Sequence, residues 1–481
     1  MPGGSDAGNL LSPGKFMALA SPRRKALPSD LNAALKARFG ERYSTALAVR
    51  EHHGKDASYH PNMPPDAVVF AETTAEVAEA VKLCAAAKVP IIPFGTGTGL
   101  EGNIAALEGG VTIDLSRMNK ILRVSAEDLD CTVEAGVTRK QLNQHLRDTG
   151  LFFPIDPGAD ASLGGMAATR ASGTNAVRYG TMRENVLSLT VVLADGRIIR
   201  TSRRARKSAA GYDLTRLFVG SEGTLGVITE VSLRLYGIPE AIRAAVCAFP
   251  DVDAAVETVV ATIQAGVPVA RIELIDAVTM DAVNRYSKLD HKVAPTLMFE
   301  FHGTERGVEE QVGQVRDFAS EHGGSEFRWA AGHEERNRLW QARHDAYFAV
   351  LALRPGCEGW ATDVCVPISK LPQCISETER DLAQSGLLAP IVGHAGDGNF
   401  HLVFLLDPKN PAEFEQAKKV NARMVARAIA MDGTCTGEHG VGYGKTEFLI
   451  AEHGEALSVM RAIKRALDPD NIMNPGKILR S

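Results

Sequence analysis

The sequence predicts an α+β protein made of two unlike parts. Between residues 64 and 238, short apolar strands alternate with helices and with glycine-rich loops. From residue 239 onward, apolar strands and helices are mixed, which is typical of an antiparallel sheet with helices on one face. A chain of 481 residues is too long for a single hydrophobic core, so two or three domains are expected.

Composition and charge exclude several classes of protein. Hydrophobic residues make up 45% and charged residues 23% of the chain, which is ordinary for a soluble globular protein. The net charge of −5 gives no electrostatic basis for binding nucleic acid. Seven cysteines without a C-x-x-C pair indicate buried thiols in a reducing compartment. We expect a cytoplasmic protein, with attachment at the inner membrane surface or a mitochondrial presequence as alternatives.

The first part opens with helix and strand signals in regular order. Residues 1–28 are rich in Pro, Gly and Ser and lack hydrophobic periodicity, so a flexible tail is expected. A helix is predicted over residues 29–40, where an Asp caps the start and a Gly the end. A strand at 67–70 and a helix at 75–87 follow. A strand at 89–93 then leads into the first glycine-rich loop.

The loop at residues 94–103 contains four glycines, and its successive backbone N–H groups can surround a diphosphate. Residues 97–102 also match the G-x-G-x-x-G fingerprint of nicotinamide-dependent dehydrogenases. That fold needs a helix directly after the loop. Here the chain runs almost at once into a strand at 111–115. A nicotinamide-dependent dehydrogenase therefore stays as an alternative that the local context disfavours.

More glycine- and hydroxyl-rich stretches follow at residues 156–166, 172–175 and 220–228. A strand at 131–135 and a helix at 138–149 precede them. Taken singly, each stretch is an ordinary loop of a strand-rich domain. Together they suit a large, extended cofactor that is bound along several backbone turns.

A predicted β-hairpin near the C-terminal end carries two histidines. Apolar runs flank a Gly/Asp/Asn cluster at residues 393–401, the pattern of a tight hairpin that folds His394 and His401 toward each other. A second glycine-rich turn at residues 434–440 contains Glu438. Two imidazoles and a carboxylate make a divalent-metal site with open positions for substrate, and zinc and manganese both fit. The alternative is that these are ordinary turn residues.

Three more residues belong to these two turns. His439 follows Glu438, and an imidazole titrates near neutrality, which suits a general base. The competing assignment makes His439 the metal ligand instead of Glu438. Asn399 in the hairpin offers polar support, and Cys435 in the second turn is the cysteine closest to the predicted chemistry.

These loops and turns resemble those of a known protein family. Residues from about 60 to 238 look like the PCMH-type FAD-binding domain of the vanillyl-alcohol oxidase flavoproteins. The remainder resembles the C-terminal cap of FAD-linked D-2-hydroxy-acid dehydrogenases, most of all those of the cytochrome-type D-lactate class, near glycolate oxidase flavin subunits. The strings that carry this resemblance are residues 362–367, 394–401, 434–440 and 474–477.

The resemblance implies a domain organisation and a flavin site. A tail at residues 1–28 would precede an FAD-binding domain at 29–238 and a cap or substrate domain at 239–481. The loop at 94–103 has no His or Cys, so noncovalent FAD is expected. The implied flavin contacts are Pro93, Gly95, Thr96, Gly97, Thr98, Gly99, Asn103, Pro157, Gly158, Ala159, Ser162, Gly165, Gly173, Asn175 and Ile228.

The resemblance also implies a substrate site. Residues 340–344 match the family segment in which an Arg binds the substrate carboxylate, which places Arg343 in that role. The planar guanidinium pairs with both carboxylate oxygens at once. Without the resemblance, Arg343 would be taken for a surface residue of a helix. Relatives that bind hydroxyglutarate carry a Lys near the start of the string at 362–367, where this chain reads Ala361-Thr362-Asp363, so a small monocarboxylate is favoured over a dicarboxylate.

The activity implied is oxidation of a small D-2-hydroxy acid, with D-lactate favoured, by FAD and a divalent metal. Electrons would pass to an acceptor such as cytochrome c or a quinone, and the expected assembly is a homodimer. The catalytic set would be Arg343, Asn399 and His439, and the metal ligands His394, His401 and Glu438. A glycolate or D-2-hydroxyglutarate dehydrogenase subunit of a larger complex, or a noncatalytic flavin or metal subunit, are the alternatives.

Overall fold

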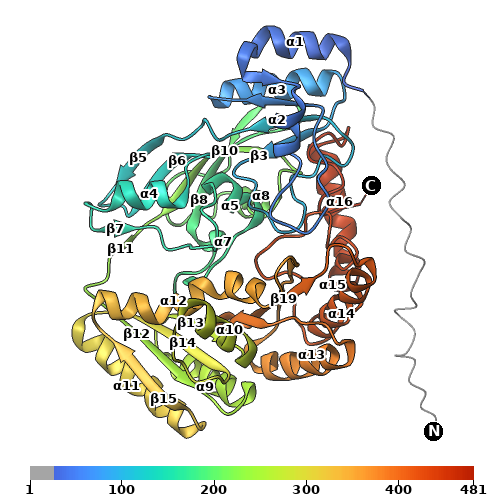
Figure 1. Ribbon diagram of the computed structural model, residues 1–481. Helices are drawn as coiled ribbons and strands as arrows, with labels where there is room; N and C mark the ends of the chain where they lie inside the picture. Colours follow the sequence, from blue (N-terminus) through green and yellow to red (C-terminus); the bar gives the residue numbers. More distant parts are fainter. Residues whose placement is uncertain (1–25, 481) are drawn as a thin grey trace, which may run out of the picture.

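The computed structural model describes residues 26–480, so most of the tail predicted at residues 1–28 lies outside the described residues. Figure 1 shows an upper part that contains the elements from α1 to β11 and a lower part built around β12 to β19. The last helix, α16 (Ala456–Leu467), runs back to the upper part. The boundary near residue 238 stays a prediction.

A four-stranded sheet forms the top of the upper part. Its order is β1-β2-β4-β3, in which β2, β4 and β3 run parallel and β1 is antiparallel to β2. Between β3 and β4 there is no helix, so the nicotinamide-dependent alternative lacks the crossover helix that it needs. The elements are α1 (Ser29–Phe39), η1 (Gly40–Arg42), β1 (Tyr43–Ser44), α2 (Leu47–His52), β2 (Ala67–Phe70), α3 (Thr74–Ala86), β3 (Ile91–Phe94) and β4 (Val111–Asp114).

Helix α3 shows why this region folds as the sequence predicted. The Thr73 hydroxyl accepts a hydrogen bond from the Glu76 backbone amide, which caps the helix. The apolar face of the helix, which includes Val77, Val81 and Cys84, is completely buried against the parallel strands. The predicted helix is therefore confirmed.

A five-stranded antiparallel sheet, β5-β6-β10-β8-β9, completes the upper part together with the small pair β11-β7. Helices α4 and α5 pack beside it in one hydrophobic core. The elements are β5 (Ile121–Ser125), β6 (Asp130–Glu134), α4 (Arg139–Leu146), β7 (Leu151–Phe152), α5 (Leu163–Thr169), α6 (Ala176–Tyr179), α7 (Met182–Asn185), β8 (Val186–Val192), β9 (Ile198–Arg200), α8 (Leu214–Phe218), β10 (Val227–Arg234) and β11 (Tyr236–Gly237).

The lower part is built on one antiparallel sheet of eight strands, as predicted. Its order is β15-β12-β14-β13-β18-β19-β16, and β17 pairs with β19 beside this path. The strands are β12 (Ala241–Ala248), β13 (Val269–Ile275), β14 (Thr296–Gly303), β15 (Ser325–Ala330), β16 (Glu358–Ala361), β17 (Val364–Cys365), β18 (Ile391–His394) and β19 (Asn399–Leu406). The central position of β13, β18 and β19 places their side chains in the interior.

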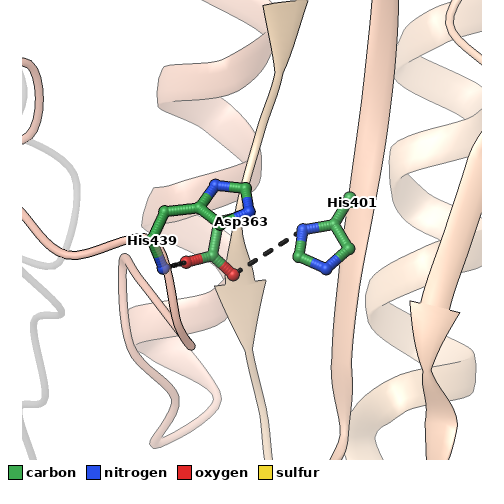
Figure 2. Close-up of side chains that lie close together, drawn as sticks. All are labelled: Asp363, His401 and His439. Atoms are coloured by element: carbon green, nitrogen blue, oxygen red, sulfur yellow. Dashed lines mark hydrogen bonds and ion pairs between the residues drawn. The ribbon is translucent and has the colours of Figure 1, made fainter. Parts of the chain in front are cut away.

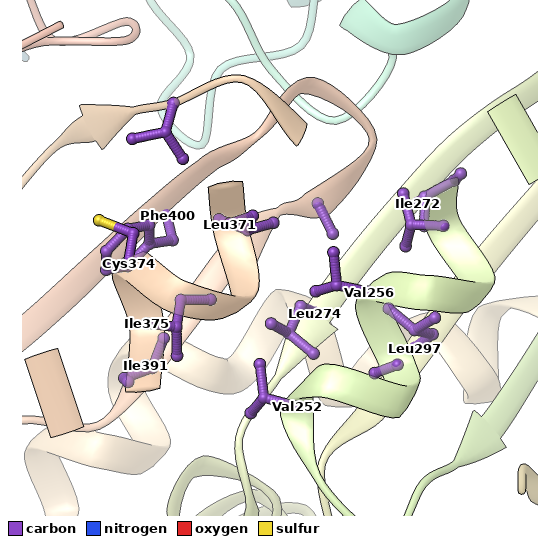
Figure 3. Close-up of a cluster of buried hydrophobic side chains, with 14 of the residues drawn as sticks. Val252, Val256, Ile272, Leu274, Leu297, Leu371, Cys374, Ile375, Ile391 and Phe400 are labelled. Carbon is purple, nitrogen blue, oxygen red and sulfur yellow. The ribbon is translucent and has the colours of Figure 1, made fainter. Parts of the chain in front are cut away.

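The prediction that helices cover one face of this sheet is wrong, because they cover both. Cys247 of β12 faces the core that includes α9, α11, α13 and α14, whereas Val246 faces the core that includes α10 and α12. Figure 3 shows part of the first core. Strands buried on both faces read as continuous apolar runs rather than as alternating ones. The helices are α9 (Val252–Gln264), α10 (Ala277–Ser287), α11 (Glu305–Glu321), α12 (His333–Ala352), η2 (Ile368–Lys370), α13 (Leu371–Ser385), η3 (Ala395–Asp397), α14 (Pro411–Ala430) and α15 (Leu449–His453).

The C-terminal segment joins the two parts. Met473 is completely buried in the core of the four-stranded sheet, and the Ile91 amide donates to the Ile472 carbonyl at 2.7 Å. The Lys464 ammonium donates to the Thr224 carbonyl at 2.8 Å. Loops of the upper part are thereby held against the turns of the lower part. Over residues 26–480, no helix is both long and apolar enough to cross a bilayer.

Candidate active site

The predicted histidine hairpin is confirmed. Strands β18 and β19 pair so that His394 faces Asn399 and Val392 faces His401. The imidazole centroids of His394 and His401 are therefore only 5.5 Å apart. The turn requires Gly398, whose φ is +76° and whose added Cβ would lie 2.0 Å from the Val366 carbonyl oxygen.

Glu438 completes a group of three possible metal ligands. Its Oε1 lies 3.0 Å from the His394 Nε2 and 3.3 Å from the His401 Nε2. The three ligand atoms lie within 4.8 Å of one another. Two imidazole nitrogens and one carboxylate oxygen fit a divalent transition metal such as zinc or manganese, and they leave coordination positions for other ligands.

The second ring nitrogen of each histidine is fixed by its own partner. His401 Nδ1 lies 2.8 Å from the Thr362 carbonyl oxygen, to which it donates. His394 Nδ1 lies 2.7 Å from Glu273 Oε1. Nδ1–H donation of this kind orients each ring and leaves the Nε2 lone pair directed at Glu438.

The electrostatics around His394 favour a cation. Burial opposes the charged imidazole, but the carboxylates of Glu273 and Glu438 raise the pKa of His394 well above its ordinary value. Burial likewise opposes ionisation of Glu438, yet His394 and His401 hold the pKa of its carboxyl well below the usual range. The position between Glu273 and Glu438 is thus stabilised by positive charge, which a proton or a metal ion supplies.

Glu273 connects this group to Arg343. It lies on β13 with no exposed side-chain surface, and its Oε2 accepts a hydrogen bond from Arg343 Nε at 2.7 Å. The interpretation of Arg343 as a surface residue is wrong, because its side chain is only 19% exposed. Among residues 26–480, its Nη groups have no hydrogen-bond or ion-pair partner. The outer edge of the guanidinium can therefore bind a carboxylate.

Asp363 holds the turn that carries Glu438, a role that the sequence did not reveal. Its Oδ2 accepts the backbone amides of Glu438 at 2.9 Å and His439 at 3.0 Å, and the Thr436 hydroxyl at 2.7 Å. Asn399 Nδ2 donates to the other oxygen, Oδ1, at 2.8 Å. Asn399, predicted as polar support, thus has its amide nitrogen bound to Asp363.

Figure 2 shows His439 together with Asp363 and His401, one of the three possible ligands. Its ring stacks on that of His401, with 5.0 Å between centroids and 11° between planes. Its Nδ1 is buried, 3.8 Å from Glu101 Oε1, and has no hydrogen-bond partner among the described residues. Burial opposes its charged form, but Asp363 and then Glu101 raise the pKa of His439.

A second possible ligand group consists of Asp363, His401 and His439. It is less suitable, because Asp363 already accepts backbone amides and His401 Nδ1 already donates to the Thr362 carbonyl. Cys435 in the same turn is buried, and burial raises the pKa of its thiol. A neutral thiol is a poor metal ligand.

The glycine loops of the upper part come together as a cofactor site would require. The backbone amides of residues 96–103 donate no hydrogen bond to any part of the chain that the structure describes. An added Cβ on Gly95 would lie 2.2 Å from Ser162 Oγ, and one on Gly223 2.8 Å from Pro93. Ser162 Oγ and Asn103 Oδ1 are buried without a partner. A row of free amides beside unpaired polar atoms fits the diphosphate of a dinucleotide.

Two predicted flavin contacts are engaged elsewhere. Asn175 Nδ2 donates to the Pro154 carbonyl at 2.9 Å, and its Oδ1 accepts from Arg271 at 3.0 Å. An added Cβ on Gly173 would lie 2.6 Å from Asp156. Asn175 thus connects the loop at 154–175 to Arg271 of the lower part, and the close approach of Asp156 leaves no room for a side chain at Gly173.

Comparison with known proteins decides the family. Residues 65–202 match the FAD binding domain model, and residues 238–478 match the C-terminal domain model of FAD linked oxidases. The chain belongs to the FAD-linked oxidases. The resemblance drawn from the glycine loops and the histidine turns is confirmed, and FAD is the cofactor that the family supports.

Two curated relatives extend over most of the chain. A protein of Danio rerio named "Probable D-lactate dehydrogenase, mitochondrial" is 57% identical over 443 residues, which are 91% of this chain and 89% of the relative. A protein of Arabidopsis thaliana named "D-lactate dehydrogenase [cytochrome], mitochondrial" is 47% identical over 99% of this chain and 83% of its own length.

The fold is shared with more distant proteins of known structure. The crystal structure of p-cresol methylhydroxylase with bound substrate superimposes with a TM-score of 0.79 at 20% identity, covering 93% of this chain and 96% of that one. At this identity the likeness concerns the fold alone. The PCMH-type fold predicted for this FAD-linked oxidase is confirmed.

Replacing Glu273 with Gln tests the connection between Arg343 and His394. The amide cannot accept from both side chains as the carboxylate does, and it leaves one of them without its partner. We expect metal affinity to fall by about 10- to 100-fold, measured by competition with a chelator. Glu300→Gln is the matched control, because Glu300 is buried on the neighbouring strand and pairs with His302 and Arg271. Equal metal affinity in wild type and Glu273→Gln would contradict this connection.

Proposed function

We propose that this enzyme oxidises D-lactate to pyruvate with FAD and a divalent metal. One observation carries the proposal: two imidazoles and a carboxylate converge beside an arginine whose outer edge is unpaired. The names of the two relatives described above support D-lactate as the substrate. A 2-hydroxy acid has two polar groups that match this site: a carboxylate, which the arginine can bind, and a hydroxyl, which the metal can bind.

Arg343 binds the carboxylate in this proposal. Its Nε is held by Glu273, so the guanidinium plane is oriented before substrate arrives. A two-pronged charged contact fixes the C2 carbon as well as the carboxylate. Residues 361–363 contain no Lys that could bind a second carboxylate, which favours a monocarboxylate.

His394, His401 and Glu438 hold the metal, zinc or manganese, and His439 takes the hydroxyl proton. A bound divalent cation lowers the pKa of a coordinated hydroxyl by several units, and bound FAD supplies the hydride acceptor. The His439 ring lies parallel to that of a ligand, His401, and its Nδ1 is unpaired. It is therefore placed to receive a proton released next to the metal.

Five further assignments belong to this proposal. FAD is held noncovalently, because the loop at 94–103 offers no His or Cys. The electron acceptor is a cytochrome or a quinone, in keeping with the relative whose name includes cytochrome. The enzyme works in the cytoplasm, including at the inner membrane surface, and as a homodimer. The domain boundary falls between residues 238 and 239.

Removal of the metal tests the proposal directly. In anaerobic single-turnover experiments, D-lactate should bleach the flavin absorbance of the purified enzyme. Dialysis against a strong chelator should abolish the bleaching while flavin stays bound, and added Zn²⁺ or Mn²⁺ should restore it, because the hydroxyl is not ionised at neutral pH without a cation. Full bleaching in protein that elemental analysis shows to be metal-free would overturn the metal role.

Replacing His439 with Asn separates a base from a ligand. If His439 takes the proton, the variant keeps its metal and flavin, and flavin reduction slows by about 10²- to 10⁴-fold. Its pH–rate profile should also lose the fall on the acid side, since an imidazole base must be neutral to act. Loss of metal together with activity would instead identify His439 as a ligand. A wild-type reduction rate would remove His439 from the mechanism.

A further inference from the structure

A buried glutamate of the upper part holds the loop that follows Glu438. Glu222 lies in the glycine-rich stretch at 220–228 and is 5% exposed. Its φ is +50°, in the left-handed region that non-glycine residues rarely adopt. Backbone strain of this kind persists where surrounding contacts fix the residue.

Three N–H donors converge on this carboxylate. The backbone amides of Val441 and Gly442 donate to it at 2.7 and 2.8 Å, and Asn103 Nδ2 donates at 2.6 Å. An ionised carboxylate has only acceptors, so it can satisfy all three donors at once. The amide of a Gln would turn an NH₂ group toward at least one N–H, and this position requires a carboxylate.

The loop fits closely around this contact. An added Cβ on Gly440 would lie 2.8 Å from Glu222 Oε1, and one on Gly442 would lie 1.8 Å from the Glu101 carbonyl oxygen. Gly442 also has a φ of +51°. Asn474 Nδ2 donates to the backbone carbonyls of Glu222 and Asn103. The loop at 440–442 therefore has no room to move away from Glu222 without breaking these contacts.

The hydrogen-bond partners of Glu222 belong to the two sites described above, the flavin loop and the turn that carries Glu438. Asn103 ends the loop whose free amides fit the flavin diphosphate, and Val441 follows the ligand Glu438 by three residues. We propose that Glu222 is a positioning residue that fixes the metal-bearing turn against the flavin-binding loop. This inference rests on the proposed function, because it assigns a purpose to the turn that carries Glu438.

The turn is thus held from both sides by buried carboxylates. Asp363 of the lower part accepts the amides of Glu438 and His439, and Glu222 of the upper part accepts those of Val441 and Gly442. Each part of the molecule controls one end of the turn. Loss of the Glu222 contact should leave the Asp363 contact intact and free only the end nearest the flavin loop.

The inference predicts a local effect of Glu222→Gln in the FAD-loaded enzyme. Hydrogen–deuterium exchange of peptides that cover residues 436–446 should rise by about tenfold or more, because at least one of the N–H donors that converge on Glu222 loses its acceptor and faces an NH₂ group instead. Release of metal to a chelator should accelerate by a similar factor. Flavin reduction by D-lactate should slow mainly in kcat, since Arg343 is untouched.

The matched control is Glu134→Gln. Glu134 is a buried carboxylate of the same part, on β6, and accepts the Lys120 amide at 2.8 Å. The control makes the same change of a buried carboxylate to an amide away from the turn, so exchange at 436–446 and metal release should stay at the wild-type rate. Equal changes in both variants would mean that Glu222 contributes only to the overall stability of the protein, and this would overturn the inference.

A second variant reaches the same contact from the other side. Gly440→Ala places a methyl group against Glu222 Oε1 without altering the carboxylate, and it should also raise exchange over residues 436–446. Gly386→Ala is its control, because Gly386 has a φ of +69° but open space around its Cβ position. Wild-type exchange in both Glu222→Gln and Gly440→Ala would overturn the inference. If Glu222→Gln folds poorly, wild-type exchange in Gly440→Ala alone would overturn it.

The exchange measurement separates this inference from the proposed function. If the wild-type enzyme proves active without metal, the metal role fails, while exchange at residues 436–446 still reports whether Glu222 holds the turn. If the wild-type enzyme needs metal and Glu222→Gln exchanges and releases metal as wild type does, only the positioning role fails.

Discussion

Uncompensated negative charge inside the protein is the constraint on which the site depends. Four carboxylates, of Glu101, Glu273, Asp363 and Glu438, lie around the histidine hairpin, and the first three are almost fully buried. Two cations, Arg343 and Lys445, pair with them. With neutral imidazoles, two negative charges remain in this group, and buried charge without a partner is strongly unfavourable. A divalent cation between His394, His401 and Glu438 removes that imbalance.

The same constraint explains the local backbone structure. Asp363 and Glu222 are buried carboxylates that point at backbone amides, and they anchor the two ends of the turn that carries Glu438 and His439. Because one anchor comes from each part of the molecule, the turn lies where both parts meet. The C-terminal segment, which returns to the upper part through Met473, keeps them together.

Much of this arrangement could be predicted from local sequence. Apolar runs around a glycine cluster identified the hairpin, and residue chemistry identified His394, His401 and Glu438. The partners Glu273, on β13, and Asp363, between β16 and β17, were missed, because they approach from parts of the chain far away in sequence. Their signal was an acidic residue within an apolar strand, as in residues 271–275, where a charge is expected only if it is paired. Helices on both faces of the lower sheet were not predicted, because its strands show no alternation of apolar and polar residues that would distinguish the two faces.

X-ray absorption at the metal edge of the purified FAD-loaded enzyme tests the central claim most directly. The account predicts one divalent transition metal per chain, with scattering from two imidazoles and from light oxygen ligands and without sulfur. The imidazole contribution should fall by half in His401→Ala and remain complete in His439→Asn. Absence of metal, a sulfur ligand, or an imidazole contribution that is lost in His439→Asn would contradict the assignment of His394, His401 and Glu438.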